Sequence, residues 1–114
     1  MPPDLKKATE RVAEARSSLA HFSPTEESLR QVEEVLTDGY ALALVGDAWS
    51  KRAERHLHEL IDAALQPSGA GDLRALSIEL GNFQRGLVAL RDGLGNLRGE
   101  YVRIRGPVTS LRPG

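Results

Sequence analysis

Apolar residues recur at intervals of three and four positions along most of this 114-residue chain. Side chains at that interval lie on one face of an α-helix, whereas a strand would require alternation. Three segments carry the pattern, at about residues 4–22, 24–65 and 72–104. We therefore expect an all-α fold of three helices. The second and third segments would form a long antiparallel coiled-coil hairpin, with the shorter first helix packed on it.

The third segment has the most regular pattern. From Leu73 to Ile104, apolar residues alternate spacings of three and four without a gap, which is typical of a coiled-coil seam. Gly86 and Gly93 share one heptad position, so we interpret them as places where a neighbouring helix packs closely. Each glycine inside a helix costs about 1 kcal/mol relative to alanine, and this segment contains Gly81, Gly86, Gly93, Gly95 and Gly99.

The run from Gly93 to Gly99, GLGNLRG, suggests an alternative, a glycine-rich loop that binds phosphate. The run lacks the G-x-G-x-x-G spacing, and no strand is expected before it. Because the apolar seam also continues through this run, helix packing is the favoured interpretation.

The middle of the second segment allows two interpretations. Asp38 and Gly39 could form a turn before a short strand over residues 40–45, with residues 101–105 as the candidate partner strand. Alternatively one helix continues, with glycines such as Gly39 and Gly46 at a crowded helix contact. We favour the continuous helix, because the sequence between these glycines is rich in alanine and leucine and a lone strand needs a partner.

Local signals place the helix ends. Ser23, Pro24 and Glu26 have the spacing of an N-cap, a first-turn proline and a capping-box glutamate. The second helix is therefore expected to begin at Pro24. Proline and glycine in residues 66–71 predict a loop.

The chain is expected to form one domain, because 114 residues suit a single modest core. Gly106 and Pro107 are expected to end the third helix. Residues 1–106 would then be a single helical domain, and residues 107–114 a loose C-terminal tail.

The expected helix lengths leave part of the hairpin uncovered. At 1.5 Å per residue the three helices measure roughly 28, 64 and 50 Å, so the first covers only half of the second. Residues 48–65 and 72–88 then form a bare two-helix arm, and we expect a homodimer in which two arms complete a four-helix bundle. The predicted interface residues are Trp49, Leu57, Leu60, Ile61, Leu65, Leu73, Leu76, Leu80 and Phe83.

Composition agrees with helices and excludes some functions. The chain is 40% hydrophobic but only 4% aromatic, and leucine and alanine dominate its apolar set, which favours helix packing. Without cysteine, it has no disulfide framework and no thiolate chemistry. The first residues lack a secretory pattern and no apolar run is long enough for a bilayer, so we expect a cytoplasmic protein with no membrane contact.

Charge is unevenly distributed around the net value of −1. Basic residues accumulate after residue 85, where Arg91, Arg98 and Arg105 repeat every seven positions on one helix face. This possible anion-binding stripe supports one alternative function, a nucleic-acid-associated accessory protein. Against it, the sequence has no helix-turn-helix or zinc-finger pattern and few aromatic residues. We favour the other explanation, that the basic end packs against the acidic first half of its own chain or of a second chain.

No metal site is expected, and the candidate ligands for one would be Glu54, His58 and Asp62. Their spacing of four places them on one helix face, where they could hold a metal ion. A small helical-bundle metal protein or enzyme is therefore a second alternative. The paired Glu-x-x-His motifs of di-iron bundles are missing, and exposed charges at this spacing are ordinary on helices.

No arrangement of nucleophile, base and acid is apparent in the sequence, so no catalytic residue and no cofactor are expected. The sequence therefore favours a non-enzymatic interaction or assembly module that self-associates through its helical hairpin. An unidentified protein partner is a further possibility.

Overall fold

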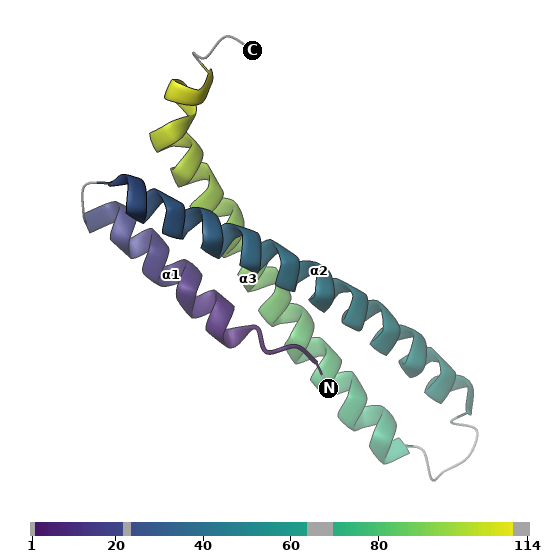
Figure 1. Cartoon of the computed structure of the whole chain (residues 1–114). Coiled ribbons are helices and arrows are strands. Elements are labelled where there is room, and N and C mark those ends of the chain that lie inside the picture. Colours follow the sequence, from purple (N-terminus) through teal and green to yellow (C-terminus); the bar gives the residue numbers. More distant parts are fainter. Residues whose placement is uncertain (1, 22–23, 64–69, 111–114) are drawn as a thin grey trace.

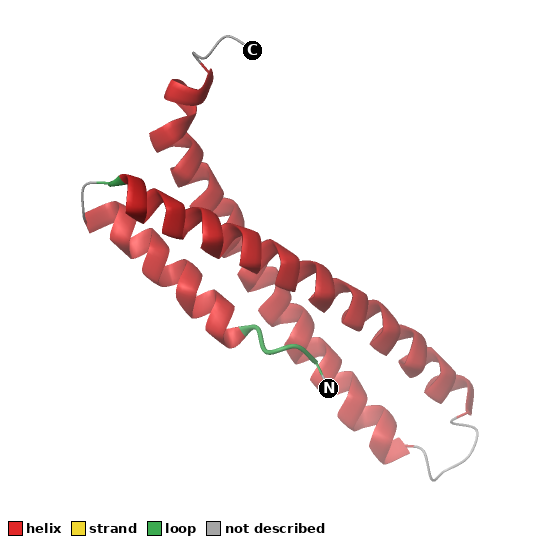
Figure 2. Cartoon of the chain, viewed as in Figure 1, coloured by secondary structure: helices red, strands yellow, loops and turns green. Residues whose placement is uncertain are grey.

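The computed structural model describes residues 2–21, 24–63 and 70–110, and these residues form three helices (Figure 1). They are α1 (Lys6–His21), α2 (Glu26–Ala63) and α3 (Ala70–Ser110). Helices α2 and α3 form an antiparallel hairpin, and α1 contacts both. The remainder of the described chain is loop, with no strand (Figure 2). The predicted all-α class and three-helix architecture are confirmed.

The molecule is elongated. Its radius of gyration is 19.1 Å, whereas a compact chain of this length would have about 13 Å. Leu5, just before α1, lies beside Gly86, and Val12 of α1 lies beside Gly93, so α1 runs parallel to α3. The hairpin continues well past the start of α1, and the C-terminal turns of α3 extend beyond the start of α2 (Figure 1).

The core lies where all three helices meet. Leu90, Leu94 and Leu97 of α3 are completely buried, so the predicted heptad seam is confirmed over the centre of α3. The buried cluster consists of Leu5, Val12, Val32, Ala43, Phe83, Leu87, Leu90, Leu94 and Leu97.

Helix α2 continues without a break through Gly39 and Gly46, so the alternative with a strand at residues 40–45 is wrong. The glycines explain how the two long helices approach each other. A Cβ atom on Gly39 would lie 2.5 Å from Leu94 Cδ2, and one on Gly46 would lie 3.2 Å from Leu87 Cδ1. Leucine side chains of α3 therefore pack directly against the α2 backbone at both positions.

The start of α2 differs from the prediction. The Thr25 carbonyl accepts the first helical bond, from Leu29 N–H at 2.9 Å, which makes Thr25 the N-cap. Thr25 Oγ1 accepts from the Ser28 N–H at 3.0 Å, and Ser28 Oγ accepts from the Thr25 N–H at 2.7 Å. The helix begins at Glu26, so the start predicted at Pro24 is wrong, because Thr25 and Ser28 form the reciprocal cap. Ser23 lies outside the described residues.

The end of α3 also differs from the prediction. The helix continues through Gly106 and Pro107 to Ser110, so the stop predicted at these two residues is wrong. Proline lacks the backbone N–H, but its φ of about −65° lies in the helical range, so a helix can continue through it with one hydrogen bond fewer. Residues 111–114 of the predicted tail lie outside the described residues.

Candidate interaction surface

Three residues of the predicted arm interface already pack against other residues of the same chain. Leu80 and Phe83 are buried. The Trp49 ring packs edge-on against Phe83, with ring centroids 4.7 Å apart. The prediction that these side chains form an intermolecular interface is therefore corrected, because they belong to the hairpin's own core.

The rest of the arm retains an uncovered apolar surface. Leu57, Leu60, Leu73 and Leu76 are half-buried between the two helices. Ile61 and Ile78 are 50% and 58% exposed. Pro2 of the N-terminal segment lines a shallow hollow beside Ile78. Leu65 lies outside the described residues.

A second apolar surface lies between α2 and α3 in the middle of the hairpin. Its exposed members are Leu44 (72%), Val88 (56%), Val102 (50%) and Tyr40 (38%). An open hollow of ≈ 420 Å³ joins the two helices here, with Leu36 and Tyr40 on one side and Val102 on the other. We call this surface the central face; it consists of Leu36, Tyr40 and Leu44 of α2 and Val88, Gly95 and Val102 of α3.

The central face points away from α1. Val88 and Gly95 follow Gly86 and Gly93 by two residues, which is more than half a turn around the helix, and Gly86 and Gly93 are the positions that contact α1. The sequence does contain the spacings of the central face, four residues in α2 and seven residues in α3. The sequence alone could not show that the two sets form one surface, because that depends on which residues of the two helices lie side by side.

The arginine stripe is largely engaged in ion pairs with α2. Arg91 Nη2 lies 3.2 Å from Asp47 Oδ1. Arg105 lies 3.7 Å from Glu26 and 4.0 Å from Glu33. These pairs support the interpretation that the basic end packs against the acidic half of the same chain. Arg98 is exposed beside the central face and makes no ion pair within the described residues.

Two ionisable groups between α2 and α3 have shifted pKa values. Hydrogen bonds from Lys51 and Arg91 hold the pKa of Asp47 below its ordinary value of 3.8. Burial raises the pKa of Tyr101, and the hydrogen bond that its hydroxyl donates to Glu33 raises it further. Both groups act as structural links between the helices, because each is held by a charged side chain of the opposite helix.

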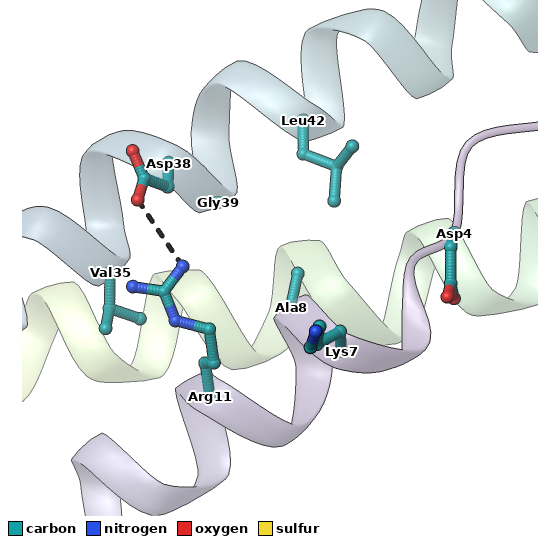
Figure 3. Close-up of a pocket in the computed structure, with 8 residues that line it drawn as sticks. All are labelled: Asp4, Lys7, Ala8, Arg11, Val35, Asp38, Gly39 and Leu42. Atoms are coloured by element: carbon teal, nitrogen blue, oxygen red, sulfur yellow. Dashed lines mark hydrogen bonds and ion pairs between the residues drawn. The ribbon is translucent and has the colours of Figure 1, made fainter.

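A cleft between the start of α1 and the middle of α2 has charged edges (Figure 3). Its volume is ≈ 220 Å³, and Ala8, Val35 and Leu42 contribute its apolar walls. Arg11 lies across it, with Nη1 3.4 Å from Asp38 Oδ2. Its charged groups thus already include an internal ion pair.

The structure does not gather Glu54, His58 and Asp62 into a metal centre. All three side chains are exposed along α2. Glu54 Oε1 accepts a hydrogen bond of 2.7 Å from Gln84 Nε2. Across the described ranges, no group of three or more histidine, aspartate and glutamate side chains is placed to hold a metal ion. The three residues form part of a solvated face.

The two glycines predicted to mark close packing both face α1, to different degrees. A Cβ atom on Gly93 would lie 3.1 Å from Val12 Cγ1, which is a tight contact. A Cβ atom on Gly86 would lie 3.7 Å from Leu5 Cδ1, an ordinary van der Waals distance. The close approach is therefore found at Gly93, whereas the contact at Gly86 has room for a methyl group.

Comparison of the chain with protein families, curated proteins and solved structures finds no match. Among the helices described, none combines the length and the apolar stretch that crossing a membrane would require.

Proposed function

We propose that this chain is a non-enzymatic assembly module that self-associates through the α2–α3 hairpin, forming a homodimer. One observation carries the proposal. Within the described residues, every large apolar side chain with substantial exposure lies on α2 or α3, and none lies on α1. These side chains are Tyr40, Leu44, Val45, Ile61, Ile78, Val88 and Val102.

Burial of apolar surface is the main source of stability in association, at about 25 cal/mol per Å². An elongated three-helix chain has a large surface for its core, and α1 covers only part of the hairpin. A second copy would cover the remainder and complete a helical bundle. A two-fold dimer requires only that the same surface be complementary to itself.

A nucleic-acid role is not proposed, because α2 carboxylates neutralise two of the three arginines on which that hypothesis depends. A metal-dependent function is not proposed either, since the residues suggested for it remain separate on an exposed helix face.

Sedimentation equilibrium tests the proposal directly. We expect the 12.4 kDa chain to sediment as a dimer at micromolar concentrations and to dissociate on dilution. A single 12.4 kDa species at every concentration would show that the proposal is wrong.

Charged substitutions would then locate the interface. Ile61→Asp and Ile78→Asp probe the arm, and Leu44→Asp probes the central face. Val45→Asp is the matched control, because Val45 is comparably exposed but lies one residue from Leu44, on a different face of α2. A hairpin dimer requires at least one of the first three variants to weaken association while Val45→Asp leaves it unchanged.

A further inference from the structure

We infer that two copies associate through the central face, around a two-fold axis that passes close to Tyr40 and Gly95. This inference rests on the proposed function, because it names the surface through which that same self-association takes place. It differs from the arm-to-arm contact expected from the sequence, and the two can be separated experimentally.

The contacts between α2 and α3 define how the two helices are aligned. Gly39 lies opposite Leu94, and Gly46 lies opposite Leu87. The two helices are therefore aligned so that each later residue of α2 is level with one earlier residue of α3. On this alignment Tyr40 is level with residue 93, which lies two residues, or about 3 Å along the helix, from Gly95.

The apolar positions are symmetric around that shared level. In α2, Leu36 and Leu44 lie four residues before and after Tyr40. In α3, Val88 and Val102 lie seven residues before and after Gly95. A two-fold axis that lies in the interface, perpendicular to the helix axes, would place Leu44 against Leu36 of the second copy. The same axis would place Val88 against Val102 of the second copy.

This symmetry is what identifies the occupant. An isologous interface requires each contact to occur twice, with the two residues exchanged between the copies. Evenly spaced residues on one helix are always symmetric about the middle one, so the informative observation is that the midpoints on the two helices, Tyr40 and Gly95, lie within about 3 Å of the same level. The central face meets the two-fold requirement with both helices at once, so a second copy of this chain is the partner that it fits.

Gly95 supports the same axis. A Cβ atom on Gly95 would have no neighbour within 4 Å, so packing within the chain does not explain a glycine there. Gly39, in contrast, is required by Leu94 in its own chain. At the axis, Gly95 of each copy would allow the two α3 helices to approach closely, since neither presents a side chain.

The charges across the face are also complementary. Arg98 lines the hollow at the edge of the central face and makes no ion pair in the part of its chain that the structure describes. On the proposed axis it lies level with Leu44 of the second copy, within about one turn of that copy's Asp47. A carboxylate accepts up to about four hydrogen bonds, so Asp47 can accept from Arg98 of the second copy in addition to its own Lys51 and Arg91.

Single-cysteine cross-linking tests the axis, and the chain has no native cysteine to interfere. Tyr40→Cys places a thiol near the axis, so we expect a short bismaleimide to link two copies in high yield. Val45→Cys, on another face of α2, and Ile61→Cys, on the arm, should give little product under the same conditions.

The outcomes distinguish the inference from the proposed function. If the unmodified chain is a dimer but Ile61→Cys cross-links and Tyr40→Cys does not, the chain self-associates through its arm and the central-face inference is overturned. If the unmodified chain sediments as a monomer, both are overturned. Cross-linking through Tyr40→Cys alone supports both.

Gly95→Gln provides a second readout that an unfolded variant could not imitate. Glutamine favours a helix more than glycine does, so the variant should keep its helical circular dichroism and unfold at the same temperature or higher when diluted to monomer. At the axis it should weaken dimerisation by about tenfold or more. Unchanged dimerisation of Gly95→Gln would overturn the close approach of the two α3 helices.

Discussion

Among the glycines of the described residues, Gly39 is the position where packing leaves the least room for a side chain. Its α-carbon hydrogen faces Leu94, a side chain that is completely buried. A methyl group placed there would meet Leu94 Cδ2 at 2.5 Å, and the surrounding core restricts how far Leu94 can move. Gly99 also lies inside an α-helix, α3, but no atom lies within 4 Å of the position that its Cβ would take.

Because of this contrast, we predict that the same substitution to alanine changes the free energy of unfolding in opposite directions at Gly39 and Gly99. Gly39→Ala should lower the free energy of unfolding by about 1 kcal/mol, because overpacking of 1–3 kcal/mol exceeds the gain in helix propensity. Gly99→Ala should raise it by about 0.5–1 kcal/mol. Urea denaturation followed by circular dichroism measures both changes. A gain in stability for Gly39→Ala equal to that for Gly99→Ala would show that the Leu94 contact is not tight.

Asp47 gives a prediction on pH. Because hydrogen bonds from Lys51 and Arg91 lower its pKa in the folded state, its contribution to stability is present above the ordinary value of 3.8 and is lost as pH falls through the lower folded value. Asp47→Asn should therefore reduce the loss of stability between neutral pH and pH 3. Glu34→Gln, on an exposed carboxylate, is the control. Equal acid sensitivity of Asp47→Asn and the unmodified chain would contradict the role of these bonds.

At the scale of the helices, the sequence pattern predicted what depends on one helix alone. The unbroken spacing through Leu90, Leu94 and Leu97 was enough to predict the buried seam of α3, because period and burial are directly related. The start of α2 was not predictable in this way. Thr25 and Ser28 form the cap with a serine where the common motif has glutamate, so the neighbouring Ser23 and Glu26 gave a misleading match.

The central face was missed for a different reason. Tyr40 and Leu44 look like part of an ordinary apolar stripe, and Val88 and Val102 are separated from them by more than 40 residues. Only the alignment of α2 with α3 shows that these side chains share one surface. Glu54, His58 and Asp62 illustrate the converse, because a spacing of four on one helix does not by itself bring ligands from a second helix.

The uneven cover provided by α1 predicts uneven stability along the hairpin. Amide hydrogens of residues 87–97, where three helices meet, should exchange with solvent most slowly. Amides of residues 52–63, in the arm, should exchange much faster, because only one neighbouring helix restrains them. Hydrogen exchange followed by mass spectrometry resolves the two segments. Equal protection in a dimeric sample would instead indicate that a second copy covers the arm.

At the scale of the whole molecule, the shape and the exposed apolar residues have one common explanation. A chain with dimensions of 63 × 32 × 16 Å has a thin, flat form. Its exposed apolar side chains lie on the two long helices, within the part of the chain that the structure describes. Pairing two such molecules through the central face would thicken the assembly and lengthen it only slightly, whereas joining them arm to arm would lengthen it considerably.

Small-angle X-ray scattering on the size-exclusion peak therefore tests self-association through the hairpin most directly. We expect the forward scattering to give twice the mass of the 12.4 kDa chain. The longest dimension should be roughly 70 Å, because α2 ends 23 residues, or roughly 35 Å, beyond the axis near Tyr40 in each copy. Twice the mass with a much greater length would favour the arm over the central face. A 12.4 kDa particle with a radius of gyration near 19.1 Å would mean that the chain does not assemble with itself.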